Sequence, residues 1–411
     1  MTIQTPILIG GCIRIAPRFL TRHMGIFGAT GTGKTTTAAA VVKQLGCPVI
    51  VLDAKGDLGG LGDVIAPWEG AQMPVAALGA DLMRRVLDLS EAQAGALEIA
   101  LAWAEDQGFG VATLDDLASV LNQIAAGADV SAYGLVSPLS LAAVQRAILR
   151  FRRAAPWAFG HRALDPFKWR AGRTIIHAPD LVAVHGLYAT FAAHLLETVY
   201  AGLGEIGDAG APGMAIMVDE AHLLFQDAPA AVTRRLEQIV RLIRSKGVSL
   251  IFVTQSPADL PQAILGQLAT RIQHGLRAGT PAQQTAARAA AETMPGNVTA
   301  PDILGLAMGE AFISTPDGSG KPIPAARVKV QPVALPHRIF SDAPPSIHPA
   351  SGLHISLTRR ETQAAQTLGV YAQLQDAAAR IEANPKPRPW YFWPLTIAAA
   401  IYGPMILVGM F

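Results

Sequence analysis

A glycine-rich segment near the amino terminus has the residue types and spacing to bind phosphate. It reads GATGTGKT and fits the pattern G-x-x-x-x-G-K-[S/T] of a phosphate-binding loop. Glycines let consecutive backbone N–H groups turn toward phosphate oxygens, because no Cβ atoms stand in the way. Lys34 can reach the β- and γ-phosphates, and the hydroxyl of Thr35 can ligate Mg²⁺. We therefore expect ATP and Mg²⁺ to bind at Gly28, Ala29, Thr30, Gly31, Thr32, Gly33, Lys34, Thr35 and Thr36.

Two consecutive acidic residues, Asp219 and Glu220, follow the apolar run 214–218. Carboxylates at the end of a buried strand are costly unless they have charged or metal partners. We expect Asp219 to hold Mg²⁺, and Glu220 to orient and deprotonate the water that attacks the γ-phosphate. The alternative is a surface strand end without a catalytic role. The pair favours a hydrolysing site over a kinase, which has reason to avoid a water-activating base.

Gln255 ends the next apolar run, 249–254. Its amide can contact the γ-phosphate or the attacking water, or it can simply fix the turn that follows. Phosphoryl transfer also needs positive charge on the transition state, often from an arginine of a neighbouring subunit. The candidates include Arg241 and Arg277, but we favour Arg244 and Arg271.

Apolar runs of strand type alternate with helical stretches around these residues. The run 24–27 precedes the glycine-rich segment and the alanine-rich stretch 36–45 follows it, as a strand and a helix should. Residues 49–53 and 174–177 have the same strand character. This alternation predicts an α/β fold of the P-loop type, with a mostly parallel sheet and helices on both faces. Parallel strands end at one edge, where open sheets bind their ligands.

Residues 81–172 read as a helical insertion, because their apolar residues recur at helical spacing. Basic residues gather toward its end, at Arg146, Arg150, Arg152 and Arg153, and Trp157 lies close behind them. Basic side chains interleaved with aromatic ones can contact the phosphates and bases of a nucleic acid. The alternative is a solvated helix face beside aromatic residues of the core.

Composition sets limits on the whole chain. It has 411 residues, of which 51% are hydrophobic and 16% charged, so it can bury a large core and is not disordered. The formal net charge of +2 gives no general basic surface, so any contact with nucleic acid has to be local. Cys12 and Cys47 fit neither a disulfide framework nor a metal site, and no signal peptide is recognisable. We therefore expect a cytoplasmic body.

The last 22 residues, 390–411, contain no charged side chain. As a helix they would span roughly 33 Å, close to the thickness of a bilayer core. Lys386 and Arg388 precede an aromatic cluster, as in an anchor that holds a cytoplasmic body at the inner membrane. A buried apolar helix is the alternative. The expected organisation is a core in two parts (1–80 and 173–333), the insertion (81–172), a linker with a helix (334–389) and a C-terminal hydrophobic helix as candidate transmembrane anchor (390–411).

The ordered motifs resemble those of the HerA-like bacterial ATPases of the HerA–FtsK superfamily. The similar segments are GATGTGKT (28–35), LDAKGDL (52–58), VDEAHLLF (218–225), RLIRSKGV (241–248), FVTQSPADLP (252–261) and LGQLATRIQHGLRAGTP (265–281). This resemblance implies a RecA-like core of the additional-strand catalytic glutamate class, a hexameric ring and DNA translocation or helicase activity. It also implies Lys34 and Thr35 on phosphate and Mg²⁺, Asp219 on Mg²⁺, Glu220 as base and Gln255 as sensor. A nuclease is the partner of HerA itself.

Two other functions remain open on this sequence. The apolar carboxyl-terminal segment favours a membrane-tethered ATPase that energises macromolecular transfer with a secretion partner, like the ATPases of type IV secretion. The other alternative is a nucleotide-dependent binding switch with slow turnover. DNA-stimulated hydrolysis, hydrolysis that requires membranes, and a burst without sustained turnover would distinguish the three.

Overall fold

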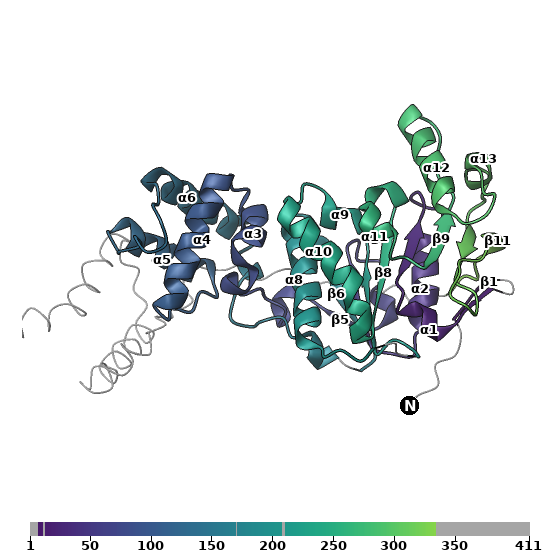
Figure 1. The fold of residues 1–411 in the computed structure, drawn as a ribbon, viewed down its shortest axis with the longest axis horizontal. Helices are drawn as coiled ribbons and strands as arrows, with labels where there is room; N and C mark the ends of the chain where they lie inside the picture. Colours follow the sequence, from purple (N-terminus) through teal and green to yellow (C-terminus); the bar gives the residue numbers. More distant parts are fainter. Residues whose placement is uncertain (1–6, 11–12, 170, 208–209, 334–411) are drawn as a thin grey trace, which may run out of the picture. The chain divides into compact units, whose positions relative to one another are not determined.

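The fold is built on a central sheet, and the computed structural model describes residues 7–10, 13–169, 171–207 and 210–333. Among these residues the sheet has nine strands in the order β11-β10-β9-β3-β8-β7-β4-β6-β5 (Figure 1). The strands from β9 to β5 in this order are parallel, and β10 and β11 extend the sheet by antiparallel pairing. A separate antiparallel hairpin joins β1 to β2. The strands are β1 (Ile7–Gly10), β2 (Ile13–Ile15), β3 (Met24–Phe27), β4 (Val49–Asp53), β5 (Asp63–Ile65), β6 (Arg173–His177), β7 (Met214–Val218), β8 (Val248–Thr254), β9 (Thr270–His274), β10 (Glu310–Ser314) and β11 (Ala326–Lys329).

Helices connect most of the parallel strands, so the chain returns to the sheet in the same direction. The α-helices are α1 (Pro17–Leu20), α2 (Lys34–Gln44), α3 (Val75–Leu87), α4 (Glu91–Asp106), α5 (Leu114–Ala125), α6 (Pro138–Ala154), α7 (Pro179–Val182), α8 (Leu187–Gly202), α9 (His222–Phe225), α10 (Ala230–Leu242), α11 (Gln262–Leu265), α12 (Pro281–Thr293) and α13 (Ala300–Leu304). Short 3₁₀ turns are η1 (Gly59–Leu61), η2 (Pro67–Glu69), η3 (Pro156–Ala158), η4 (Pro166–Trp169), η5 (Ile243–Lys246) and η6 (Pro257–Asp259). The predicted α/β fold with a mostly parallel sheet is confirmed.

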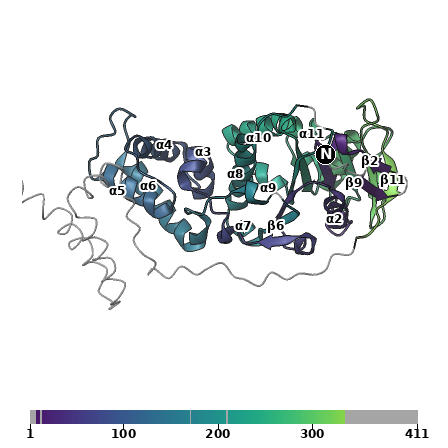
Figure 2. The same cartoon turned by 90° about the horizontal axis from the view of Figure 1, so that it is seen from below.

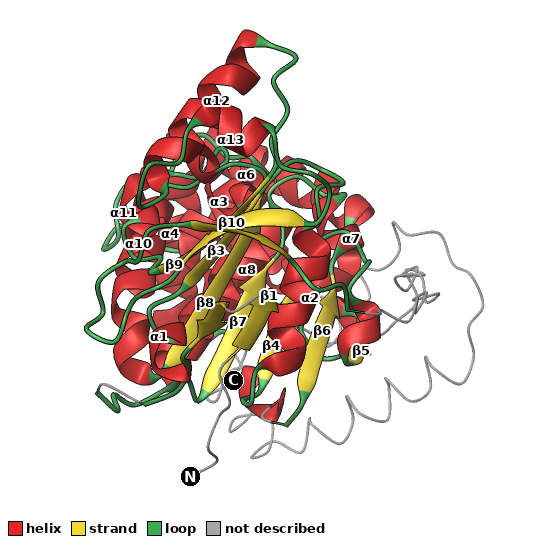
Figure 3. Cartoon of the chain, turned by 90° about the vertical axis from the view of Figure 1, so that its right-hand side faces the viewer, coloured by secondary structure: helices red, strands yellow, loops and turns green. Residues whose placement is uncertain are grey.

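Both faces of the parallel sheet are covered. On one face, Val49 and Val51 of β4 belong to the same core as Val41 and Val42 of α2. Side chains alternate along a strand, so Ile50 points to the opposite face. Figures 2 and 3 show α2 on one side of the sheet and α8 and α10 on the other. Strands β4, β7 and β8 are buried along their whole length, as expected for parallel strands between two layers of helices.

Helices α3 to α6 occupy the region for which the sequence predicts a helical insertion, although α3 already begins at Val75. Helix α4 packs against α3, α5 and α6, and Figure 2 shows the four helices gathered together. Trp157 is buried, and its ring lies edge-on to that of Trp68 at 5.2 Å between centroids. The idea that Trp157 stacks on nucleic-acid bases is therefore wrong, because this ring belongs to the core.

The chain enters and leaves the insertion at neighbouring points. Isolated parallel bridges join Gln72 to Ala163 and Met73 to Phe159. The Gln72 N–H donates to the carbonyl oxygen of Arg162 at 3.0 Å, which closes the base of the insertion further. The helices between these points can therefore form without displacing the strands on either side.

The sequence did not predict several short strands, because they have no clear apolar pattern. These are β5, β10, β11 and the two strands of the β1–β2 hairpin. The hairpin is held on α2 by Gln44, whose side-chain amide exchanges two 2.9 Å hydrogen bonds with the backbone of Leu8. The linker, helix and apolar segment expected over 334–411 lie outside the described residues. None of the described helices is both long and apolar enough to cross a membrane.

Candidate functional site

The glycine-rich loop joins β3 to α2 and is tethered to both neighbouring strands. The N–H of Gly28 donates to the carbonyl oxygen of Gln255 after β8 at 3.0 Å, and that of Ala29 to Gly275 after β9 at 2.9 Å. Gly28 has a φ of 149°, and a Cβ atom there would lie 2.5 Å from Cβ of His274. The position therefore requires glycine. The loop ends at the first turn of α2, where free N–H groups and the helix dipole favour a bound anion.

Lys34 begins α2 and is buried against the loop that precedes it. Its Nζ donates to the carbonyl oxygens of Gly28 (2.5 Å) and Ala29 (3.0 Å). Burial is the main cause that lowers the pKa of Lys34, the charge of Lys55 adds to the lowering, and three nearby carboxylates oppose it. Thr35 follows on the same turn, and its hydroxyl lies 3.5 Å from Oδ2 of Asp57. The ammonium and the hydroxyl are thus both beside the loop, as phosphate and cation binding require.

The acidic pair and Gln255 reach the same edge of the sheet as the loop. Strand β3 pairs in parallel with β8, and β8 pairs in parallel with β7, so the carboxyl ends of the three strands adjoin. The loop follows β3, Gln255 follows β8, and Asp219 and Glu220 follow β7. The structure therefore brings together the three features that the sequence singled out.

Asp219 is buried at the end of β7, and its backbone is fixed on both sides. Its N–H donates to the carbonyl oxygen of Leu52 at 3.1 Å, and the hydroxyl of Tyr188 on α8 donates to its carbonyl oxygen. Burial, reinforced by the charge of Glu220 and opposed by Lys55, raises the pKa of Asp219 to about 7. A cation beside this carboxyl would favour its ionised form.

Mg²⁺ fits this arrangement. Among the described residues no group of three or more His, Cys, Asp or Glu side chains is placed to hold a metal. Mg²⁺ commonly takes only one or two protein ligands and completes its shell with nucleotide phosphate and water. Asp219 and the Thr35 hydroxyl are a donor set of that kind.

Glu220 is held by contacts from two segments. Its Oε1 forms an ion pair with Lys55 in the turn after β4, and its Oε2 lies 3.2 Å from Nδ1 of His222. Burial alone would raise the pKa of Glu220, but these contacts outweigh it and lower the pKa to about 2. The residue has a φ of 46°, in the left-handed region that side chains other than glycine seldom occupy. Glu220 is therefore an ionised carboxylate on a constrained backbone.

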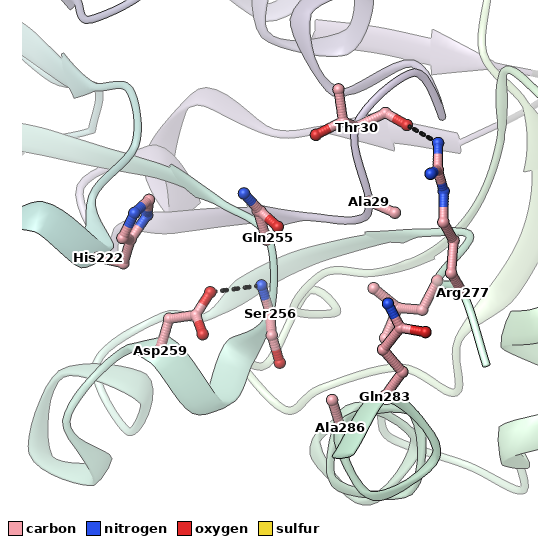
Figure 4. Close-up of a pocket in the computed structure, with 10 residues that line it drawn as sticks. Ala29, Thr30, His222, Gln255, Ser256, Asp259, Arg277, Gln283 and Ala286 are labelled. Atoms are coloured by element: carbon pink, nitrogen blue, oxygen red, sulfur yellow. Dashed lines mark hydrogen bonds between the residues drawn. The ribbon is translucent and has the colours of Figure 1, made fainter. Parts of the chain in front are cut away.

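A cavity of about 400 Å³ opens beside the loop and contains the predicted sensor (Figure 4). Gln255 is exposed and lies between His222 and the loop. Arg277 reaches the loop from the segment after β9, where its Nη2 donates to the carbonyl oxygen of Thr30 at 3.2 Å. The lining residues are Ala29, Thr30, His222, Gln255, Ser256, Asp259, Leu276, Arg277, Gln283 and Ala286.

The two favoured arginines lie elsewhere. Arg271 donates to the carbonyl oxygens of Leu268 and Leu265 at 3.2 and 2.9 Å, and also to that of Thr293. Arg244 lies in η5, which precedes β8, whereas Gln255 follows β8. A strand of seven residues spans roughly 23 Å, so Arg244 is at the opposite edge of the sheet from the loop. Arg244 is therefore remote from the loop of its own chain.

Lys55, Arg277 and Tyr188 are site residues to which the sequence predictions assigned no role or gave no preference. Lys55 lies in a turn that Asp53 organises by accepting N–H groups, among them that of Leu58 at 2.8 Å. The position of this turn after a strand was a signal for a ligand-binding edge. Its pairing with Glu220 depends on β4 lying beside β7, which the order of strands along the chain does not reveal.

Several solved structures share this architecture. The bacterial conjugative coupling protein TrwBdeltaN70, in complex with sulphate, superimposes with a TM-score of 0.59 at 15% identity, over 81% of this chain and 90% of that one. TrwB with the non-hydrolysable GTP analogue GDPNP gives 0.58 at 15% identity, over 82% and 91%. VirB4 of Thermoanaerobacter pseudethanolicus gives 0.56 at 16% identity, over 76% and 90%. At these identities the likeness concerns the fold. No curated protein sequence matches significantly.

Family models identify the chain more closely than single structures do. The model for the HerA-like helicase C-terminal region matches residues 69–338, and that for the HerA central domain matches residues 10–126. Together they cover the phosphate-binding loop, the acidic pair and Gln255. The chain belongs to the HerA-like family of P-loop ATPases.

Proposed function

We propose that this protein works as a hexameric ring of identical subunits that couples ATP hydrolysis to the movement of DNA. ATP hydrolysis is supported by one observation. The phosphate-binding loop, Gln255 and the Asp219–Glu220 pair lie together at one edge of the sheet. A site with only the loop could bind nucleotide, whereas the ionised carboxylate of Glu220 adds a base for the attacking water.

The chemistry follows from these positions. The loop N–H groups and the ammonium of Lys34 neutralise the phosphates, and Glu220 accepts the proton of the water as it attacks the γ-phosphate. Mg²⁺, held by Thr35 and Asp219, would add positive charge at the phosphate oxygens. In this proposal the amide of Gln255 contacts the γ-phosphate and responds to its cleavage. The remaining positive charge comes from an arginine, for which Arg244 of a neighbouring subunit is our candidate.

DNA is the proposed substrate because of a basic face on α6. Arg146, Arg150 and Arg153 recur at intervals of four and three residues, which places them on one side of the helix. All three are exposed, and none forms an ion pair within the described part of the chain. Such unpaired arginines suit the phosphate backbone of DNA, whose binding releases counterions. The buried Trp157 argues for backbone contacts without base stacking.

The test compares ATP hydrolysis with and without double-stranded DNA. We expect DNA to raise the rate of the natural protein. Replacing Arg146, Arg150 and Arg153 together with glutamine should remove most of this increase and reduce the salt dependence of DNA binding. The matched control is Arg152→Gln, because Arg152 on the same helix is paired with Asp115 at 2.6 Å. Equal loss in the control and the triple variant would contradict DNA binding by this face.

A second candidate function is a membrane-tethered ATPase that energises macromolecular transfer. It is favoured by the uncharged segment 390–411 and by the fold shared with a conjugative coupling protein. Under this proposal a cytoplasmic body is held at the inner membrane and works with a secretion partner. Deleting 390–411 should move the protein from the membrane fraction to the soluble fraction. A full-length protein that fractionates as soluble would remove this candidate.

A further inference from the structure

The segment that carries Glu220 continues into a helix too short to satisfy its own backbone. Helix α9 has four residues and begins two positions after Glu220. The last carbonyl groups of any helix lack partners within that helix, so in a single turn nearly all of them need donors from outside. The N–H groups of Gln226 and Ala228 donate to the carbonyl oxygens of His222 (3.0 Å) and Phe225 (3.3 Å), which leaves those of Leu223 and Leu224 without a backbone donor among the described residues.

Arg85 supplies these donors from a distant part of the chain. Its Nη1 donates to the carbonyl oxygen of Leu224 at 2.7 Å, and its Nη2 donates to those of Leu223 at 2.8 Å and Gln226 at 2.6 Å. The residue is only 7% exposed. Burial lowers the pKa of Arg85 to about 10 in spite of the opposing charge of Asp227, so the guanidinium remains charged. A planar group with five donors can serve three carbonyls at once, which the ammonium of lysine cannot do with the same geometry.

Arg85 belongs to α3, the first helix of the insertion. Helix α3 packs against α4 and α6 and also against α8. At Gly186, the residue before α8, a Cβ atom would lie 2.9 Å from the carbonyl oxygen of Arg85, so the two helices meet closely at this point. Helix α8, which belongs to the core, carries Tyr188, which binds the backbone of Asp219. The insertion thus contacts the backbone after Glu220 through Arg85, and it packs against the helix that binds the backbone before Glu220.

We propose that Arg85 is a positioning residue for Glu220, through which the helical insertion fixes the catalytic carboxylate. The guanidinium holds α9, α9 fixes the turn of Glu220 and His222, and this turn keeps the carboxylate beside the attacking water. The inference rests on the proposed hydrolytic function. It assigns no contact between Arg85 and nucleotide, so its effect should fall on turnover and leave nucleotide binding intact.

The experiment measures kcat and KM for ATP in Arg85→Lys and Arg85→Ala, on the full chain. We expect kcat to fall by about 10- to 100-fold, with KM nearly unchanged, because a small displacement of a catalytic group costs rate and not affinity. Added guanidinium ion at millimolar concentration should restore part of the turnover of Arg85→Ala. The matched control is Arg173→Lys, since Arg173 also donates to helix carbonyls, those of Val42 and Lys43, at the far end of α2.

The outcomes separate this inference from the proposed function. If the natural protein does not hydrolyse ATP, the proposed function fails first. If it does, a natural kcat in Arg85→Lys overturns the positioning role, and so does an equal fall of kcat in the folded Arg173→Lys control. A large rise of KM in the Arg85 variants would also overturn it, because it would mean that Arg85 acts on nucleotide binding. If Arg85→Ala does not fold, Arg85→Lys alone tests the inference, through a fall of kcat without a rise of KM.

Discussion

At the scale of residues, the site depends on charges that hold one another in defined states. Lys55 and His222 keep Glu220 ionised, whereas Asp219, only one position away, has its pKa raised to about 7. Adjacent carboxyls with opposite shifts suit two different roles, because an ionised group can accept a proton while its neighbour becomes ionised when a cation arrives.

Removing the base should separate binding from turnover. In Glu220→Gln, we expect ATP to bind with near-natural affinity and kcat to fall by about 10²- to 10⁴-fold, since the amide cannot accept the proton of the water. Lys34→Ala should instead lose nucleotide binding. Fluorescent-nucleotide titration and steady-state hydrolysis measure the two properties. Sustained turnover by Glu220→Gln would show that another group is the base.

Three buried histidines should make the fold sensitive to mild acid. Burial lowers the pKa of His23, His194 and His274 from 6.5 to about 4. Between these values the unfolded chain takes up protons that the folded chain does not, so stability is complete above pH 6.5 and is lost as the pH falls toward 4. Each histidine contributes up to about 3 kcal/mol to this loss.

Urea unfolding above and within this pH window measures the effect. His194→Gln should weaken the pH dependence, whereas the exposed His185→Gln should leave it unchanged. An unchanged dependence in His194→Gln would show that this ring is protonated in the folded state.

The sequence predicted the loop and the acidic pair because their chemistry is local. The loop is recognised by a fixed spacing of residues, and the pair by two adjacent acidic side chains. Lys55 and Arg85 were not predicted, and Arg277 was only one of four candidate arginines, because the roles of these residues depend on residues far away in the chain. Arg85 lies 138–141 positions from the carbonyls it binds. Its own surroundings in the sequence are those of an ordinary helix.

At the scale of elements, the buried strands were predicted best. Strands β4, β7 and β8 read as continuous apolar runs, because both their faces are covered. The order in which they lie could not be predicted in this way. Strand β8 comes after β7 in the chain but lies between β7 and β3 in the sheet, and this placement puts Gln255 beside the loop.

Helix α3 is interrupted at Gly79, which has φ 65° and ψ −178°. Only glycine adopts this conformation easily, and a Cβ atom there would meet nothing within 4 Å. We therefore expect Gly79→Ala to lower the free energy of unfolding by about 1–3 kcal/mol through backbone strain alone. Gly95→Ala in α4 is the matched control, because its Cβ is equally unobstructed, and it should stabilise the protein by up to about 1 kcal/mol. Equal effects of both changes on urea unfolding would contradict the strain.

At the scale of the whole molecule, the favoured catalytic arginine is far from the loop of its own chain, because Arg244 lies at the other edge of the sheet. We propose that a ring brings that edge to the loop of the next subunit. Oligomers of one chain in which each copy repeats the same contact close into rings when the rotation allows it.

Mixing two inactive variants tests this arrangement. Glu220→Gln retains Arg244, and Arg244→Ala retains Glu220, so a mixed ring contains interfaces with both groups intact. We expect the mixture to regain ATP hydrolysis that neither variant shows alone, and the rate of the natural protein per chain to rise with concentration. No recovery in a mixture that is shown by mass to have exchanged subunits would rule out Arg244 as the residue acting between subunits.

The closed base of the insertion has a consequence for how such a protein can change. Since Gln72 and Met73 bridge to Ala163 and Phe159, the chain enters and leaves the helical insertion at one place. We expect the helices between these bridges to form an exchangeable module. They can be lengthened, shortened or replaced by those of a relative while the catalytic strands stay in register. A core with the module cut out would keep Lys34, Asp219 and Glu220 and would lose Arg85. Exchange of this one module would thus keep the residues that bind the nucleotide and change the residue that we propose to position the base.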